Sequence, residues 1–287
     1  MILRRLPRKG VAMKKSEVNL GFGCFFPGTE REQVTEILLQ ALDAGYRYFD
    51  TASFYFTEEQ LGEALRQSKI PREDVYIATK LWISERGYDA ANAALERSLT
   101  RLGLDYVDAY LIHWPKGPDP NEDWVSLDLA TWQAMEEQKA KGRVRELGLS
   151  NFLPHHLQPL LDAGYQPVIN QLELHPGYGQ EYAVAKSLEQ GMQVPAWSPL
   201  GRGAVLDHPL LLEFAAKYGA SVSQICLAYL KQRGIFPIVK ASSLKRMQEN
   251  LAFTAVKLTA EDISKIACLP QIGYSGEHPD DSMPGHK

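Results

Sequence analysis

The chain has few cysteines and none of the spacings that cysteines show in disulfide-rich or zinc-binding domains. Its 287 residues include only Cys24, Cys226 and Cys268, which lie far apart and form no Cys-x-x-Cys pair. An odd, widely spaced set of cysteines argues against both a disulfide framework and a zinc site. We therefore expect no metal centre and a reducing, cytoplasmic location.

Long apolar runs and a charge excess are also missing. No stretch approaches the roughly 20 apolar residues that cross a bilayer, and the basic N-terminus lacks the apolar core of a signal peptide. The formal net charge is −4 and both signs are well mixed, so we expect no nucleic-acid or membrane partner. Gly21-Phe22-Gly23 is followed by Cys24-Phe25-Phe26, which breaks the Gly-x-Gly-x-x-Gly fingerprint and argues against a Rossmann module.

What the chain does have is a regular alternation of strand-like and helix-like segments. Short apolar runs predict strands at residues 18–25, 45–49, 75–79, 106–112, 144–149, 167–171, 193–197 and 236–239. Apolar residues at helical spacing predict helices after capping boxes at Thr29–Glu32 and Thr57–Gln60, and at 88–102, 127–141, 154–162, 180–190, 209–218, 222–233, 243–251 and 260–268.

Strict alternation of this kind implies parallel strands. Eight such units in one chain match a closed (β/α)8 barrel, or TIM barrel, better than an open sheet. No linker or composition break divides the chain, so we predict a single α/β domain over residues 1–287. We add a short N-terminal hairpin at 2–15 and an irregular tail after Pro270.

Polar residues follow the apolar runs at the points where the predicted strands end. These residues are Asp50, Lys80, His113, Ser150, Asn151, Gln171 and Lys240. In barrels of this type the functional residues lie at the C-terminal ends of the strands. An acid, a lysine and a histidine on three consecutive strands form the most specific part of the set, and Tyr55 follows the acid by five residues.

The chemistry that these four residues could perform together is limited. A free tyrosine has a pKa near 10, and a nearby ammonium such as Lys80 would lower it by roughly 1–3 units. Asp50 could hold the lysine in place, and His113 could donate a hydrogen bond to a substrate oxygen. The set suits proton transfer to a carbonyl oxygen that is becoming an alkoxide. It contains no electron source, so a hydride donor must come from outside.

Each of these residues also has an alternative explanation. Lys80 could bind a phosphate or form a Schiff base, as in barrel aldolases; His113 could be a core histidine; and Asp50 could cap a helix. Any one of these explanations is reasonable by itself. The four residues together favour an active site.

At this point the sequence resembles the aldo-keto reductase family, from about Leu20 to about Leu258. The resemblance rests on six motifs that occur in order. They are Gly45-x-Arg47-x-x-Asp50-Thr51-Ala52-x-x-Tyr55 with Glu58 and Leu61-Gly62, Ile77-Ala78-Thr79-Lys80-Leu81-Trp82, Leu102-Gly103-Leu104-Asp105-Tyr106-x-Asp108-x-Tyr110-Leu111-Ile112-His113-Trp114-Pro115, Gly148-Leu149-Ser150-Asn151-Phe152, Asn170-Gln171-x-Glu173-x-His175-Pro176 and Ser198-Pro199-Leu200-Gly201.

The resemblance implies a bacterial-type, monomeric reductase that uses NADPH to reduce aldehydes and ketones. Tyr55 would be the general acid, Lys80 and Asp50 would tune it, and His113 would orient the carbonyl. The implied cofactor contacts come from several loops. They are Gly23, Cys24, Asp50, Ser150, Asn151, Gln171, Trp197, Ser198, Leu200, Gly201, Lys240, Ser242, Ser243, Arg246, Glu249 and Asn250.

Within that set the resemblance assigns separate parts of the cofactor. Ser150, Asn151 and Gln171 would bind the nicotinamide amide, and Trp197 would stack on the ring where the family usually has tyrosine. Lys240 and Arg246, with Ser242 or Ser243, would bind the 2′-phosphate, and Glu249 and Asn250 would face the adenine. Ala241 stands where the family often has serine, so one expected hydroxyl is missing.

The substrate pocket implied by the resemblance is apolar and relatively open. Its predicted lining is Phe22, Tyr55, Trp82, His113 and Trp114, with Trp124 left open and residues 116–126 as one wall. Two other functions remain possible from the sequence. One is a cofactor-binding regulatory subunit of the channel-accessory type with little turnover, and the other is a Schiff-base aldolase built on Lys80.

Overall fold

The computed structural model describes residues 18–117 and 119–281, which form a closed barrel of parallel strands. The strands are β1 (Gly21–Gly23), β2 (Tyr48–Asp50), β3 (Tyr76–Leu81), β4 (Val107–Ile112), β5 (Val144–Ser150), β6 (Ile169–Glu173), β7 (Pro195–Trp197) and β8 (Phe236–Val239). Each strand pairs with the next one along the chain, and β8 pairs with β1 to close the barrel. The predicted (β/α)8 barrel is therefore confirmed.

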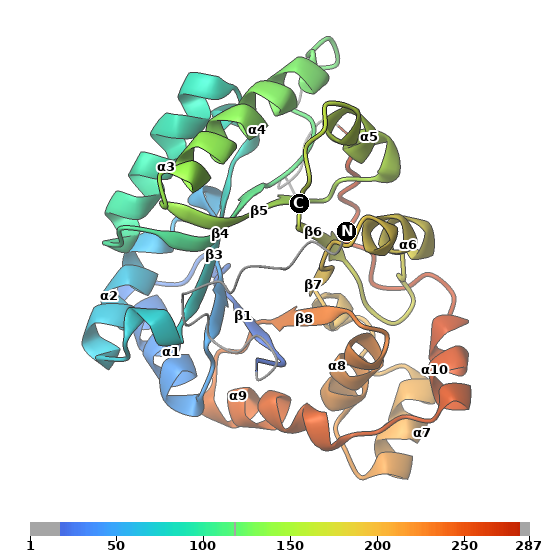
Figure 1. The fold of residues 1–287 in the computed structure, drawn as a ribbon. Coiled ribbons are helices and arrows are strands. Elements are labelled where there is room, and N and C mark those ends of the chain that lie inside the picture. The colour runs from blue at the N-terminus through green and yellow to red at the C-terminus, as the bar shows by residue number, and fades with distance from the viewer. Residues whose placement is uncertain (1–17, 118, 282–287) are drawn as a thin grey trace, which may run out of the picture.

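Helices surround these strands on the outside of the barrel (Figure 1). In the described residues they are α1 (Arg31–Ala44), α2 (Glu58–Ser68), α3 (Tyr88–Leu102), α4 (Trp124–Ala140), α5 (Pro154–Asp162), α6 (Glu181–Glu189), α7 (Pro209–Tyr218), α8 (Val222–Gln232), α9 (Leu244–Leu251) and α10 (Ala260–Ala267). After α10, residues 270–281 contain no helix or strand, as predicted for the tail. The predicted N-terminal hairpin lies outside the described residues.

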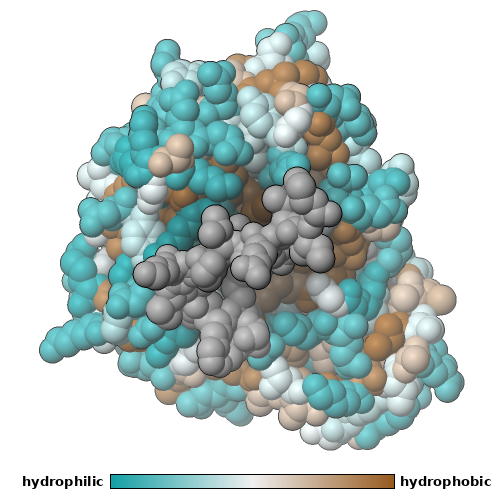
Figure 2. Space-filling view, viewed as in Figure 1, coloured by the Kyte–Doolittle hydropathy of each residue, from teal (hydrophilic) through white to brown (hydrophobic). Residues whose placement is uncertain are grey.

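Figure 2 shows the face of the molecule that is viewed in Figure 1. Its rim is mostly hydrophilic, and hydrophobic residues gather nearer its centre. Among the helices of residues 18–117 and 119–281, none is long and apolar enough to span a bilayer.

Two hydrophobic clusters result from the alternation of side chains along the strands. An inner cluster fills the barrel and consists of Tyr48, Tyr76, Ala78, Ala109, Leu111, Ile169 and Ile238. A larger outer cluster lies between strands and helices and includes Phe49 of β2 and Ile77 of β3. Successive residues of a strand point to opposite faces, so Tyr48 points inward while Phe49 packs against the helices.

The same alternation determines which polar residues reach the inside of the barrel mouth. Asp50 lies two residues after the inward-facing Tyr48, and His113 lies two residues after Leu111. Lys80 lies two residues after Ala78 and belongs to β3 itself, although the sequence predicted that β3 would end before it. Apolar inward positions therefore give way to polar ones toward the C-terminal ends of the strands.

Two predicted capping boxes are wrong. Helix α1 begins at Arg31 with Glu30 at its N-cap, and no side chain caps it. Thr57 does occupy the N-cap of α2 but makes no capping hydrogen bond. Its hydroxyl instead donates to the carbonyl of Cys24 at 2.9 Å. Tertiary contacts thus replace the local capping pattern around the segment that carries Tyr55.

Candidate active site

An ion pair between Asp50 and Lys80 lies at the base of the candidate site. Lys80 Nζ donates to Asp50 Oδ1 at 2.5 Å and to the carbonyl of Thr51 at 2.9 Å. The lysine side chain is 0% exposed. Burial alone would lower the pKa of Lys80, but the charge and hydrogen bond of Asp50, together with Tyr55, outweigh burial and raise it. Lys80 therefore carries a positive charge that solvent does not reach.

Tyr55 lies above this charge at the end of a short 3-10 turn, Ser53–Tyr55. Lys80 Nζ is 5.0 Å from the centre of the tyrosine ring. Burial raises the pKa of Tyr55 to about 12, although Lys80 acts to lower it. The expectation of a net lowered pKa is wrong because desolvation of the phenolate is the larger effect. At neutral pH the phenol is therefore protonated and can donate its proton.

His113 faces Tyr55 across the mouth of the barrel. The Tyr55 hydroxyl is 3.5 Å from His113 Nε2, and His113 Nδ1 has no hydrogen-bond partner among the described residues. Burial, followed by the nearby charge of Lys80, lowers the pKa of His113 well below its usual range. The imidazole is therefore neutral, and it can donate a hydrogen bond from one nitrogen.

A hydrogen-bonded network holds the predicted nicotinamide-binding residues to the same centre. Gln171 Nε2 donates to Asp50 Oδ2 at 2.8 Å, across the barrel from β6 to β2. Asn151 Nδ2 donates to the carbonyl of His113 and to Ser150 Oγ, both at 3.1 Å. The indole nitrogen of Trp197 donates to Asn151 Oδ1 at 2.8 Å. Residues from five strands, β2, β4, β5, β6 and β7, thus hold one another in fixed orientations.

Aromatic side chains form a wall beside Tyr55 and His113. Phe54 stacks on Trp82 with 3.9 Å between ring centres and 12° between the planes. The rings of Trp82 and His113 are nearly perpendicular, with 5.0 Å between their centres. Phe25 is 43% exposed, and its ring centre is 4.9 Å from that of Tyr55. These rings give the site an apolar, partly exposed side.

One predicted pocket residue, Phe22, does not lie on this wall. Phe22 is fully buried in the outer cluster and contacts Tyr46 and Phe49. It points away from the site because only every second residue of β1 can face the mouth. Trp114 follows His113 directly and is buried to a similar degree, and its place in the pocket stays a prediction. The sequence reasoning missed Phe25, whose position just after β1 was the available signal.

The family assignment follows from comparison with known proteins. A family model described as the Aldo/keto reductase family matches residues 19–269. The chain belongs to the aldo/keto reductase family. This confirms the resemblance in the sequence motifs.

Several relatives of this aldo/keto reductase are named reductases. The glyoxal reductase of Bacillus subtilis (strain 168) is 40% identical over 252 residues, which cover 88% of each protein. The 9,11-endoperoxide prostaglandin H2 reductase of Trypanosoma cruzi (strain CL Brener) is 39% identical over 249 residues, which cover 85% of each. A crystal structure of an aldo/keto reductase from Brucella melitensis has a TM-score of 0.80 at 37% identity and covers 87% of this chain and 93% of that one.

The residues predicted to hold the far end of the cofactor gather after β8. Lys240, Ser242, Ser243 and Arg246 are exposed, whereas Ala241 is buried. Ser243 is the N-cap of α9, and neither cation forms an ion pair with another residue in the described ranges. Unpaired cations beside a helix N-terminus are chemically suited to a phosphate group. The donors of this aldo/keto reductase therefore fit a phosphorylated dinucleotide.

The other predicted cofactor residues lie in the loops between this cluster and the catalytic centre. Gly23 and Cys24 follow β1, and the backbone nitrogen of Cys24 donates to the carbonyl of Asp50 at 2.8 Å. Ser198 and Gly201, after β7, have φ angles of 49° and 52° and flank a partly exposed Leu200. Glu249 is half-buried and Asn250 is buried on α9.

One histidine cluster in the described residues has the spacing of a metal site. His155, His156 and Asp280 offer ligand atoms within 4.8 Å of one another. However, His156 Nδ1 accepts a hydrogen bond from the backbone nitrogen of Leu153 at 3.2 Å, so a neutral His156 carries its hydrogen on Nε2. That nitrogen lies 2.9 Å from Asp280 Oδ1 but makes no hydrogen bond within residues 18–117 and 119–281. The hydrogen bond between α5 and the tail joins His155 Nε2 to Asp280 Oδ1 at 2.8 Å, and a His156 that carries its hydrogen on Nε2 cannot ligate a metal through that nitrogen.

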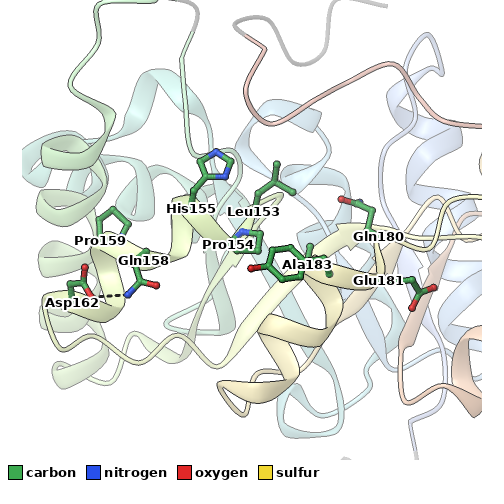
Figure 3. Close-up of a pocket in the computed structure, with 10 residues that line it drawn as sticks. Leu153, Pro154, His155, Gln158, Pro159, Asp162, Gln180, Glu181 and Ala183 are labelled. Carbon is green, nitrogen blue, oxygen red and sulfur yellow. Dashed lines mark hydrogen bonds between the residues drawn. The ribbon is translucent and has the colours of Figure 1, made fainter.

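A groove of about 810 Å³ lies near this cluster, between α5 and α6 (Figure 3). Its lining includes Leu153, Pro154 and His155 from the start of α5, and Gln180 and Glu181 from the start of α6. None of the four predicted catalytic residues lines it. The ring of Trp124, at the start of α4, is perpendicular to that of His156 on α5, with 5.2 Å between the ring centres.

Proposed function

We propose that this aldo/keto reductase reduces aldehydes and ketones to alcohols with NADPH, and that Tyr55 is the general acid. NADPH, held by the residues after β5, β6, β7 and β8, would supply the hydride for the carbonyl carbon. The Tyr55 hydroxyl gives its proton to the carbonyl oxygen, which yields the alcohol. Solvent then returns a proton to the Tyr55 phenolate. His113 donates a hydrogen bond that orients the same oxygen.

The observation that carries the proposal is the position of Tyr55 between Lys80 and His113. The phenol has a buried cation 5.0 Å from its ring centre and a neutral imidazole 3.5 Å from its oxygen. A positive charge in a dry site stabilises the phenolate that remains after proton transfer. The raised pKa keeps the proton on Tyr55 before the reaction. These features together favour an acid over a base in the resting enzyme.

NADPH rather than NADH is supported by the charge of the β8–α9 region. Lys240 and Arg246 are exposed cations near Ser242 and Ser243, and two cations complement a phosphate dianion. Ser150, Asn151 and Gln171 would hold the nicotinamide end, with Trp197 stacked on the ring. The missing hydroxyl at Ala241 removes one contact from this set and leaves both cations.

The aldolase alternative requires a neutral amine on Lys80. Its Nζ is instead fully buried, paired with Asp50, and has a raised pKa. A charged, enclosed ammonium cannot attack a carbonyl. No specific observation favours a regulatory subunit, and the intact set of four residues favours turnover.

The test is the initial rate of NADPH oxidation with a panel of carbonyl compounds. The panel includes 4-nitrobenzaldehyde, an aliphatic ketone, a sugar and, because of the glyoxal reductase relative, α-dicarbonyls. Tyr55→Phe is the matched control, since it removes only the hydroxyl. We expect loss of turnover by roughly 10²–10⁴-fold, with NADPH binding preserved. Wild-type turnover in Tyr55→Phe, or NADPH binding without turnover on the whole panel, would contradict the proposal.

A further inference from the structure

We propose that Glu85 is a positioning residue for this reaction, in addition to the four residues at the catalytic centre. Its carboxylate joins the turn that carries Tyr55 to the strand end that carries Lys80 and Trp82. The inference rests on the proposed role of Tyr55, because it concerns how that acid is held.

Glu85 lies at the end of a 3-10 turn, Ile83–Glu85, just after β3. Its Oε2 accepts hydrogen bonds from Ser53 Oγ at 2.6 Å and from the backbone nitrogen of Trp82 at 2.9 Å. Its Oε1 accepts from Arg97 Nη2 of α3 at 2.7 Å. The Glu85 side chain is 15% exposed and that of Arg97 is 48% exposed. The bonds from Ser53 and Trp82 are therefore partly buried, while the bond from Arg97 lies at the surface.

The three donors explain why a carboxylate occupies this position. Burial acts to raise the pKa of Glu85, but the hydrogen bonds from Ser53, Trp82 and Arg97 outweigh burial and lower it. The group is therefore ionised at neutral pH, and its hydrogen bonds are charge-assisted and strong.

The two contacts of Oε2 reach opposite sides of the active site. Ser53 precedes Tyr55 by two residues, and Trp82 follows Lys80 by two residues. Phe54, between Ser53 and Tyr55, stacks on Trp82. One carboxylate oxygen therefore fixes the acid, the aromatic wall and the end of β3 relative to one another.

A second carboxylate braces the same segment from the other side. Glu58 Oε1 accepts from Thr79 Oγ1 at 2.7 Å, and so it joins the start of α2 to the residue before Lys80. Glu58 follows Tyr55 by three residues, whereas Ser53 precedes it by two. Loss of the Glu85 contact would leave the Ser53–Tyr55 turn held only through its flanking residues, Thr51 on one side and Glu58 on the other. A displacement of about 1 Å in a catalytic group can reduce the rate by about 10²-fold.

The experiment compares Glu85→Ala, Glu85→Gln and Ser53→Ala, with Arg97→Ala as the matched control. We expect Glu85→Ala to lower kcat by about tenfold or more, while the Kd for NADPH stays within about twofold. Glu85→Gln should recover most of kcat, because an amide oxygen can still accept from Ser53 and Trp82. Ser53→Ala should lower kcat in the same direction. Arg97→Ala should have little effect, because Arg97 touches neither active-site segment.

The outcomes separate the two proposals. Turnover by Tyr55→Phe would refute the proposed acid. An inactive Tyr55→Phe together with wild-type kcat in Ser53→Ala would refute positioning by Glu85. If Glu85→Ala does not fold, Ser53→Ala and Glu85→Gln decide the question. A lower melting temperature of Glu85→Ala with unchanged kcat would mean that the residue is only structural, and would overturn the inference.

Discussion

A buried carboxylate pairs with a cation at both ends of the barrel, but in different surroundings. At the C-terminal end, Asp50 pairs with Lys80, which is 0% exposed. At the N-terminal end, Asp108 accepts from Arg72 at 2.7 Å and from Arg145 at 2.8 Å. Those arginine side chains are 19% and 44% exposed. The first pair is sealed from solvent, and the second is partly hydrated.

The neighbours of the two pairs also differ. Arg72 and Arg145 lie over the ring of Tyr106, with 4.2 Å and 4.1 Å from each guanidinium to the ring centre. At the other end the sealed charge of Lys80 acts on Tyr55, an ionisable group. Solvent screens exposed charges strongly and buried charges weakly. We expect from this difference that the hydrated pair contributes to the stability of the fold and that, under the proposed function, the sealed pair acts on the acid Tyr55.

Replacing one cation at each end of the barrel with a neutral residue tests most directly whether the two ion pairs differ in function. We expect Lys80→Met to lower kcat by roughly 10²–10⁴-fold, because Tyr55 would lose the charge that stabilises its phenolate. Asp50 would keep its hydrogen bond from Gln171, which favours a folded variant. Initial rates of carbonyl reduction and a thermal melt would measure the two effects.

Arg72→Met is the matched control at the N-terminal end. It removes one cation from Asp108 but leaves Arg145 and the whole catalytic centre in place. We expect kcat to stay within about threefold of wild type, with a loss of stability typical of a partly exposed ion pair, up to about 1 kcal/mol. A comparable loss of activity in both variants would mean that the two ends do not differ in function.

A second test concerns stability at the N-terminal end. Asp108 accepts from Arg72, Arg145 and the backbone nitrogen of Ile77. We expect Asp108→Asn to lower the free energy of unfolding by about 1–3 kcal/mol, after discounting for the exposed arginines. Chemical denaturation would measure this value, and kcat should be unchanged. Asp43→Asn, at an exposed position on α1, is the control. Lost activity in Asp108→Asn without lost stability would contradict the structural role.

Much of this arrangement could be predicted from the sequence because strand alternation is a local property. Apolar runs followed by Asp50 and His113 placed polar groups at the strand ends, and the closed barrel brings those ends together. Gln171 was also predicted to end its strand, but it is the middle residue of β6, which continues to Glu173. The confirmed fold therefore required only the periodicity of the chain. The helix start at Gly87-Tyr88 and the helix end at Gly45, with φ 106°, followed local rules as well.

Other features of the site could not be predicted, because they depend on contacts between residues that are far apart in the sequence. The pKa of Tyr55 is decided by the balance between burial and Lys80, and burial is known only once the barrel is closed. Phe22 and Phe25 are the same residue type only three positions apart, and the sequence does not show which one faces the site. The pairing of β1 directs Phe22 outward, and Phe25, after the strand, lies beside Tyr55. Glu85 reads as an ordinary loop acid, because its partner Ser53 is 32 residues away.

The smallest expected effect concerns the rim of the C-terminal end, in the loop after β8. Lys240 is exposed and forms no ion pair within the described ranges, although its Nζ lies 5.5 Å from the centre of the Phe26 ring. We expect Lys240→Ala to raise the KM for NADPH by about tenfold, the value of one charge-assisted hydrogen bond to phosphate.

The same substitution should change the KM for NADH by less than about twofold, because NADH has no 2′-phosphate for a charge-assisted contact. Lys141→Ala, an exposed lysine at the end of α4, removes the same charge far from α9 and controls for long-range electrostatics. Equal losses with both nicotinamides would show that Lys240 does not read the phosphate. Lys240 would then have no role in cofactor choice. The functional difference between the two ends of the barrel would depend only on Lys80.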